Sequence, residues 1–198
     1  MFLTPAMSAR GFTLVELMVA LAIVALLLMF VAPSSAIWIQ NTRLRSSAEA
    51  VTSCMQTARL EAIKRNTYVS CQLIDPNSSA WLVCLYDPVN NVCQSAQPNL
   101  AQRDKSEDAG ITTFGVDFTN SNTAIALSSG NNMPAQSTFD YFGRLASTAP
   151  NNVMRIDVRN TQLSANDERR LVVTITLGGQ IHVCDPKLSK ATNPQGCQ

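Results

Sequence analysis

The chain has 198 residues, with 15 Lys and Arg against 14 Asp and Glu, one His and six Cys. This length fits one domain, with or without an appendage. The hydrophobic fraction of 46% excludes a disordered tail protein, and the net charge of +1 argues against a generally basic nucleic-acid-binding protein. With a single His, the composition favours a structural or binding protein over an enzyme.

A long apolar segment lies near the N-terminus. Residues 17–32 are sixteen consecutive apolar positions, and the longer stretch from Phe12 adds only Thr13 and Glu16 as polar residues. As a helix, this stretch is about 31 Å long at about 1.5 Å per residue, which is enough to cross a bilayer core of about 30 Å. The rest of the sequence holds no comparable run, so we expect one membrane segment.

Three interpretations of this segment are open. A cleavable secretory signal has a basic start, a shorter apolar core and small residues at its cleavage site, for which Ser34 and Ala36 offer only a weak candidate. A simple membrane anchor explains the length of the run but not the carboxylate of Glu16 at its start. The third interpretation uses the residues that precede the helix.

The string Gly11-Phe12-Thr13-Leu14-Val15-Glu16, preceded by Arg10 and followed by the apolar run, resembles the processing site of type IV prepilins and type II secretion pseudopilins. The resemblance implies that residues 1–11 are a leader, that a membrane peptidase cleaves between Gly11 and Phe12, and that the new amino group of Phe12 is N-methylated. It also implies that Glu16 guides assembly by pairing with that amino group on a neighbouring subunit. An ionisable side chain in a membrane helix is costly and usually marks function, although a Glu near the end of the segment can also extend to the headgroups.

The helix is predicted to continue beyond the apolar run. Pro33 removes one backbone donor, so we expect a kink or a loosened turn there. We expect one helix from Phe12 to about Asn66, with residues 12–33 as its transmembrane half and residues 34–66 as an amphipathic half that packs on a globular head. The apolar stripe of this second half has spacings of three and four residues and consists of Leu44, Ala48, Val51, Met55, Ala58 and Ala62.

From Thr67 onward the apolar pattern changes to alternation, which is typical of strands. The predicted strands are 67–74, 80–86, 111–118, 123–127, 137–142, 153–158, 171–177 and 180–184. Residues 75–79 and Gly178-Gly179 indicate the turns of two hairpins, and residues 87–110 form a long polar loop. The sequence therefore predicts an α+β fold in which one long N-terminal helix packs on an antiparallel β-sheet head, residues 67–198.

Two internal segments resemble the GspH/FimT-like minor pilins, a branch of the type IV pilin-like superfamily. Ala58-Arg59-Leu60-Glu61-Ala62 is similar to the Ala–Arg–x–Glu–Ala segment that precedes the first strand in that branch, and residues 139–144 are similar to its Phe-rich strand ending in Gly–Arg. The resemblance implies a non-enzymatic structural subunit that enters or primes a type IV pilus. The close alternative is a type II secretion pseudopilin, similar to protein H, which acts in protein secretion.

The resemblance also implies a location and a set of partners. It places the protein in the bacterial inner membrane as a single-pass protein with its head in the periplasm, and then in a pilus or pseudopilus. The implied partners are other major and minor pilins or pseudopilins, the prepilin peptidase and methyltransferase, the inner-membrane assembly platform and membrane lipid. No cofactor is implied.

DNA-binding members of the branch carry a Gly–Arg–x–Arg motif near the C-terminus, and this chain departs from it. The matching stretch is Gly179-Gln180-Ile181-His182, in which both arginines are missing. Arg is the side chain best suited to forked phosphate contacts, and residues 67–198 hold nine Lys and Arg against eleven Asp and Glu. We therefore expect no DNA-binding site. A solvated charged face, rather than a basic DNA surface, is the interpretation of Arg144, Arg155, Arg159, Arg169 and Arg170.

Six cysteines allow fifteen pairings, and a segment that directs export implies an oxidising compartment. The best candidate pair is Cys184 and Cys197, which closes a C-terminal loop of a kind familiar in pilins. Cys71 and Cys84 stand symmetrically about the first predicted hairpin turn and form the second candidate pair. A local pair between Cys84 and Cys93 is its rival.

Motifs for chemistry are absent from the sequence. No C-x-x-C occurs and His182 has no further ligands at a suitable spacing, so no metal site is predicted. The sequence also lacks a P-loop, a dinucleotide-binding G-x-G-x-x-G and a nucleophile elbow. We therefore predict no catalytic residue, and we expect His182 to point to solvent.

Overall fold

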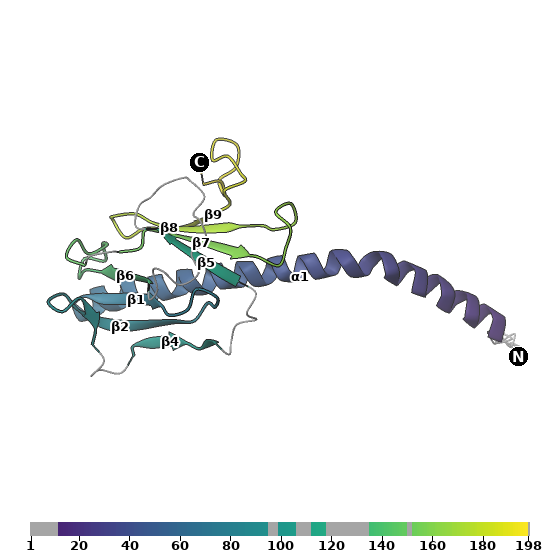
Figure 1. The fold of residues 1–198 in the computed structure, drawn as a ribbon, viewed down its shortest axis with the longest axis horizontal. Coiled ribbons are helices and arrows are strands. Elements are labelled where there is room, and N and C mark those ends of the chain that lie inside the picture. Colours follow the sequence, from purple (N-terminus) through teal and green to yellow (C-terminus); the bar gives the residue numbers. More distant parts are fainter. Residues whose placement is uncertain (1–11, 95–98, 106–111, 118–134, 150–151, 198) are drawn as a thin grey trace, which may run out of the picture. The chain divides into compact units, whose positions relative to one another are not determined.

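The structure is a computed structural model that describes residues 12–94, 99–105, 112–117, 135–149 and 152–197. The chain divides into two compact units, Met1–Trp38 and Ile39–Gln198. A single helix, α1 (Leu14–Arg65), contributes its first part to the N-terminal unit and the remainder to the second (Figure 1). The long N-terminal helix of the predicted fold is thereby confirmed. Pro33 belongs to α1. The side chain of Pro33 lies outside the described residues, and the kink expected there stays a prediction.

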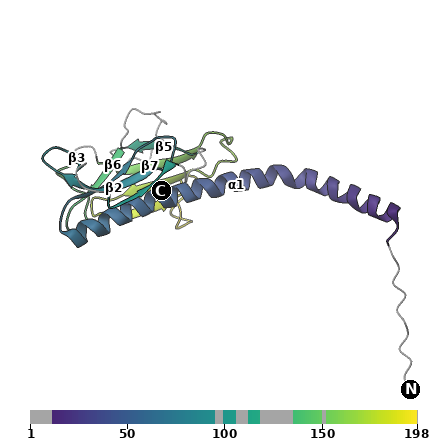
Figure 2. The same ribbon diagram turned by 90° about the horizontal axis from the view of Figure 1, so that it is seen from below.

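The second part of α1 carries the predicted stripe, and the prediction is confirmed. Each of its six side chains is at most 1% exposed, and together they pack with apolar side chains of the strands in one core. Four of the six are Ala or Val, and such small side chains let the helix lie close to the strands. Figure 2 shows the strands of the head on one side of α1.

The C-terminal end of α1 is set by backbone geometry and by charge. Asn66 adopts a left-handed φ of 52°, and the amide of Thr67 donates to the carbonyl of Ala62 at 3.2 Å, which ends the helix as a left-handed cap does. Arg65 and Lys64 lie in the last turn and both pair with Glu61, at 2.5 and 3.3 Å. The hydrogen bond from Arg65 lowers the pKa of Glu61 below its ordinary value.

The head contains two antiparallel sheets. The first has the order β3-β2-β1-β6, with β4 also paired to β2, and consists of β1 (Val69–Leu73), β2 (Trp81–Asp87), β3 (Val92–Cys93), β4 (Ala101–Arg103) and β6 (Ala135–Phe139). The second has the order β5-β7-β8-β9 and consists of β5 (Thr112–Asp117), β7 (Arg155–Asn160), β8 (Leu171–Ile175) and β9 (Ile181–Cys184). An isolated bridge pairs Gln136 of β6 with Asn152, which precedes β7. One long helix and antiparallel sheets together confirm the predicted α+β architecture.

Both predicted hairpin turns are present. The first hairpin pairs Leu73 with Trp81, on either side of residues 75–79. The second pairs Ile175 with Ile181 around Gly178-Gly179, where Gly179 has a left-handed φ of 76°. The predicted strand 123–127 lies outside the described residues. The predicted polar loop 87–110 is wrong in part, because β3 and β4 lie within it.

Candidate functional site

The predicted processing residues lie at the start of the described chain. Gly11 is outside the described residues, whereas Phe12 is 82% exposed and Glu16 is exposed in the first turn of α1. The amide of Glu16 donates to Oγ1 of Thr13 at 3.2 Å, so Thr13 is the N-cap of α1. Sequence reasoning missed this role, although a Thr followed three residues later by a Glu is the spacing of a capping box. The carboxylate of Glu16 also lies near the positive, N-terminal end of the helix dipole, where a negative charge stabilises the helix.

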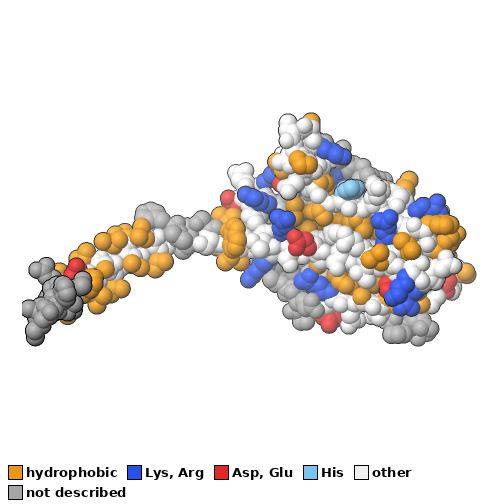
Figure 3. Space-filling model, turned by 180° about the vertical axis from the view of Figure 1, so that it is seen from behind, with side chains coloured by type: hydrophobic (Ala, Val, Ile, Leu, Met, Phe, Trp, Pro, Cys, Tyr) orange, Lys and Arg blue, Asp and Glu red, His pale blue; other side chains and the backbone are white. Residues whose placement is uncertain are grey.

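The N-terminal unit presents apolar side chains around α1. Twelve large apolar side chains between residues 12 and 28 are each at least half exposed, and Figure 3 shows such side chains along this stretch on the face in view. A helix that is apolar on all sides requires apolar surroundings. Within the described parts of the chain, no helix combines the length and apolar character that a membrane crossing requires.

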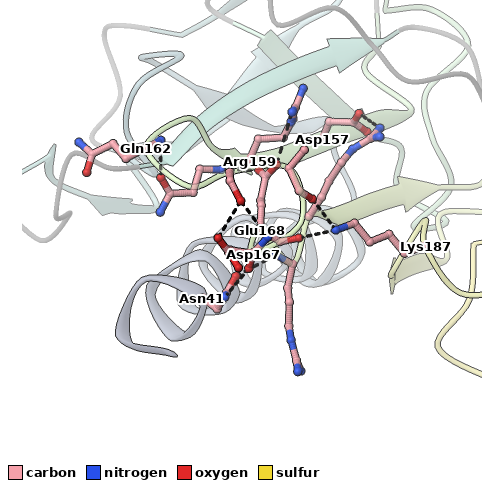
Figure 4. Close-up of polar contacts among 12 residues, drawn as sticks. Asn41, Asp157, Arg159, Gln162, Asp167, Glu168 and Lys187 are labelled. Carbon is pink, nitrogen blue, oxygen red and sulfur yellow. Dashed lines mark hydrogen bonds and ion pairs between the residues drawn. The ribbon is translucent and has the colours of Figure 1, made fainter. Parts of the chain in front are cut away.

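A polar cluster, which we call the entry cluster, holds α1 where it enters the head. It consists of Gln40, Asn41, Asn160, Asp167, Glu168, Arg169 and Lys187 (Figure 4). The side chain of Asn41 donates to the carbonyl of Asp167 at 2.9 Å and accepts from the amide of Arg169 at 2.8 Å. Gln40 accepts from Asn160 at 3.2 Å. These bonds attach α1 to the end of β7 and to the loop between β7 and β8.

Glu168 is the buried centre of the entry cluster, with 4% of its surface exposed. Its carboxylate accepts from the amide of Asn160 at 2.7 Å and from Arg159 at 3.4 Å. Lys187 donates to the carbonyls of Ala165 and Glu168, at 2.8 and 2.9 Å, and so connects the segment after β9 to the same loop. Since a buried charge is costly unless it is paired, these contacts offset the cost of burying the carboxylate of Glu168, and they hold the loop in place.

The interpretation of the five arginines as a solvated charged face is wrong for most of them. Arg155 is only 3% exposed and shares the fully buried carboxylate of Asp157 with Arg170. Arg159 pairs with Glu168, as described above. The reason is that Arg155 and Arg159 alternate with apolar residues on β7, and Arg170 directly precedes β8, which pairs with β7. Asp157 on β7 and Glu168 in the loop supply the carboxylates. Arg169 is exposed.

Arg144 belongs to the turn that follows β6. It pairs with Asp140 at 3.0 Å and lies over the ring of Phe142, 4.9 Å from the ring centre. His182 is exposed on β9, as expected, and Gln180 precedes that strand. Among the described residues, no group of three or more His, Cys, Asp or Glu side chains is placed to hold a metal ion.

The cysteines form three disulfides, and one predicted pair is wrong. Cys184 and Cys197, the pair that the sequence favoured, are joined with 5.0 Å between their Cα atoms. Cys71 is bonded to Cys54 of α1 instead of Cys84, and Cys84 is bonded to Cys93. The hairpin register explains the correction.

In that register Cys71 lies opposite Val83, whereas Cys84 lies opposite Ser70. An offset of one residue places two strand side chains on opposite faces of the sheet. Cys71 therefore faces the core and α1, whereas Cys84 faces away from α1. The rival pair Cys84–Cys93 uses that second face.

We expect the three disulfides to be reduced in a definite order when the folded full chain is treated with mild reductant. Cys54 and Cys71 are 0% and 2% exposed, and a thiolate must reach a sulfur atom to exchange with it. The bonds Cys84–Cys93 and Cys184–Cys197 should therefore be reduced first, because each includes a cysteine that is only partly buried. Alkylation at successive times followed by peptide mass spectrometry measures the order. Early labelling of Cys54 would contradict the buried position of this bond, and the same treatment in urea is the control in which all six cysteines should react.

Comparison with known proteins gives one match in the N-terminal part of the chain and one in the head. Residues 47–179 match the family described as type II transport protein GspH, and residues 6–32 match the prokaryotic N-terminal methylation motif. No curated protein matches the chain. Two crystal structures of the type IV minor pilin FimU from Pseudomonas aeruginosa strain PAO1 are similar to the chain. The structure in space group P21 is 19% identical in sequence; the match covers 81% of this chain and 99% of the FimU chain, with a TM-score of 0.48. The structure in space group P65 is 18% identical; the match covers 78% of this chain and 99% of the FimU chain, with a TM-score of 0.46.

Proposed function

The chain belongs to the family described as type II transport protein GspH, and from this premise we propose that it is a minor type IV pilin, a non-enzymatic structural subunit of a filament. The observation that carries the proposal is the N-terminal methylation motif at residues 6–32, which includes the first part of α1 with its exposed apolar side chains. Such a helix needs lipid or other such helices around it.

The proposed maturation begins at the leader, residues 1–11. Cleavage between Gly11 and Phe12 exposes the amino group of Phe12, which is then N-methylated. Residues 12–33 hold the precursor in the inner membrane, and the head, residues 67–198, lies in the periplasm. The three disulfides support that location, because such bonds persist in oxidising compartments.

Assembly is proposed to use the charge of Glu16. Its carboxylate attracts the amino group of Phe12 on a neighbouring subunit, and the low dielectric of the membrane strengthens that attraction. The apolar side chains of α1 then exchange lipid for the helices of other pilins. The proposed partners are therefore other pilins or pseudopilins, the prepilin peptidase and methyltransferase, and the inner-membrane assembly platform.

A second candidate function is that of a type II secretion pseudopilin. The description of the matched family, which names type II transport, favours it. The maturation and the role of Glu16 are the same in both functions, and only the filament differs. DNA capture has less support, because Arg155, Arg159 and Arg170 are paired with carboxylates of the head.

The N-terminus and mass of the native protein test the proposal. We expect a chain that begins at methylated Phe12, present in membranes and in filaments sheared from the cells. Mature chain in surface filaments supports the minor pilin, and mature chain whose removal blocks secretion without affecting pili supports the pseudopilin. A chain that still begins at Met1 would contradict both.

Replacement of Glu16 by Ala should reduce incorporation into filaments by at least about tenfold, the equivalent of about 1.4 kcal/mol, because the attraction for the neighbouring amino group is lost. Cleavage and methylation should continue. Quantitative blotting of filament and membrane fractions measures the distribution. Glu49→Ala, which removes an exposed carboxylate on the head portion of the same helix, is the matched control and should be incorporated normally. Normal incorporation of Glu16→Ala would show that its charge has no part in assembly.

A further inference from the structure

We propose that Trp38 anchors the chain in the lipid headgroup layer on the periplasmic side of the membrane and thereby sets the depth of the apolar helix. The inference rests on the proposed function, because it takes residues 12–33 to be the membrane segment. The proposed partner of Trp38 is the lipid surface itself.

The position of Trp38 along α1 matches the thickness of a bilayer. Residues 12–33 span about 33 Å as a helix, close to the hydrocarbon core of about 30 Å. Trp38 follows Pro33 by five residues, or about 8 Å of helix. Since a bilayer with its headgroups is about 40–45 Å thick, each headgroup layer has a depth of about 5–8 Å. Trp38 therefore lies at the outer edge of that layer when Pro33 stands at the boundary of the hydrocarbon core.

The side chain of Trp38 has the exposure and the chemistry that this layer requires. It is 70% exposed, and the following residue, Ile39, is 44% exposed. An indole ring combines a large apolar surface with one N–H donor, and Trp is enriched where one end of a side chain meets hydrocarbon and the other meets water. The second Trp of the chain, Trp81, is 8% exposed and packs in the core of the head.

The residues after Trp38 prevent the helix from entering more deeply. Gln40 and Asn41 are bonded to the head through the entry cluster, at 3.2 Å to Asn160 and at 2.8 Å to the amide of Arg169. Deeper insertion would break these bonds or bring the polar loop between β7 and β8 into the hydrocarbon. Gln40 and Asn41, polar residues of α1 that are bonded to the strands and loops of the head, thus lie within three positions of Trp38.

Fluorescence quenching in vesicles tests the position of Trp38. The full chain is reconstituted in vesicles of phosphatidylcholine and phosphatidylglycerol that carry bromine atoms either near the headgroups or near the ends of the acyl chains. Trp38→Phe leaves only the buried Trp81, and its signal is subtracted from that of the unmodified chain. We expect the Trp38 signal to be quenched at least about twofold more strongly by the shallow bromines than by the deep ones. Trp81→Phe, in which Trp38 is the only Trp, should show the same preference.

Two results would overturn the inference about Trp38 and leave the proposed function intact. Stronger quenching by the deep bromines would place Trp38 in the hydrocarbon, and no quenching in vesicles that carry the protein would place it in water. Flotation of the vesicles in a density gradient separates these results from a failure of the proposed function. A chain that does not float with the vesicles would overturn the membrane segment as well as the anchor.

Discussion

Replacement of Asp157 by Asn is expected to lower the free energy of unfolding of the head by about 3–5 kcal/mol. The carboxylate of Asp157 is fully buried and accepts from Arg155 at 3.0 Å and from Arg170. The amide has nearly the same size but no charge, so the guanidinium of Arg155, itself buried, loses the compensating charge of Asp157. The loss is a large part of the roughly 5–15 kcal/mol by which a domain is ordinarily stable.

Urea unfolding of the full chain in detergent, followed by near-ultraviolet circular dichroism, measures this loss. Glu49→Gln makes the same chemical change in an exposed ion pair with Arg45. It should cost at most about 1 kcal/mol, because water already solvates both charges. A loss of the same small size for Asp157→Asn would mean that water reaches the carboxylate and that the buried pairing is wrong.

Replacement of Gly179 by Ala is expected to destabilise the head by at least about 2 kcal/mol, because backbone strain and overpacking each cost about 1–3 kcal/mol. Gly179 has a φ of 76°, a backbone conformation that residues other than Gly rarely adopt. A methyl group there would also overlap the backbone carbonyl of Gly143, which accepts from Arg59 of α1 at 3.0 Å. The turn between β8 and β9 must therefore move away from the segment that it packs against.

The neighbouring glycine provides the matched control. The added methyl group of Gly178→Ala would meet only Oγ1 of Thr176, at 3.8 Å. Its cost should stay below about 1 kcal/mol, since no positive φ or overlap is involved. Thermal unfolding of both variants measures the difference, and equal melting temperatures would mean that the packing of this turn on Gly143 does not contribute to stability.

Local patterns in the sequence were sufficient for most of the fold. The stripe from Leu44 to Ala62 has helical spacing, and all of it is buried as predicted. The strands from 171 and from 180 were predicted by alternation and by the pair of glycines between them. By contrast, β3 and β4 have two and three residues, which is too short for alternation to be recognised. They exist because the edge of β2 pairs with them.

The cysteines show why symmetry along the sequence was not enough. Cys71 and Cys84 are equally distant from the hairpin turn, but the pairing of Cys84 with Ser70 places the two sulfur atoms on opposite faces. The correct partner of Cys71 is Cys54 on α1. No spacing rule could connect a helix residue to a strand residue before the packing of one on the other was known.

The sequence by itself determined the N-terminal methylation motif at residues 6–32, the long helix and the two hairpins, because a motif is a linear string and because periodicity is a property of neighbours along the chain. Only the tertiary structure decided the partners of Cys71 and Cys84, the burial of Arg155 against Asp157 and the attachment of Asn41 to the β7–β8 loop. These contacts join residues on different elements or depend on how deeply a side chain is buried. Strand register and burial, which fix them, arise only when the elements pack together.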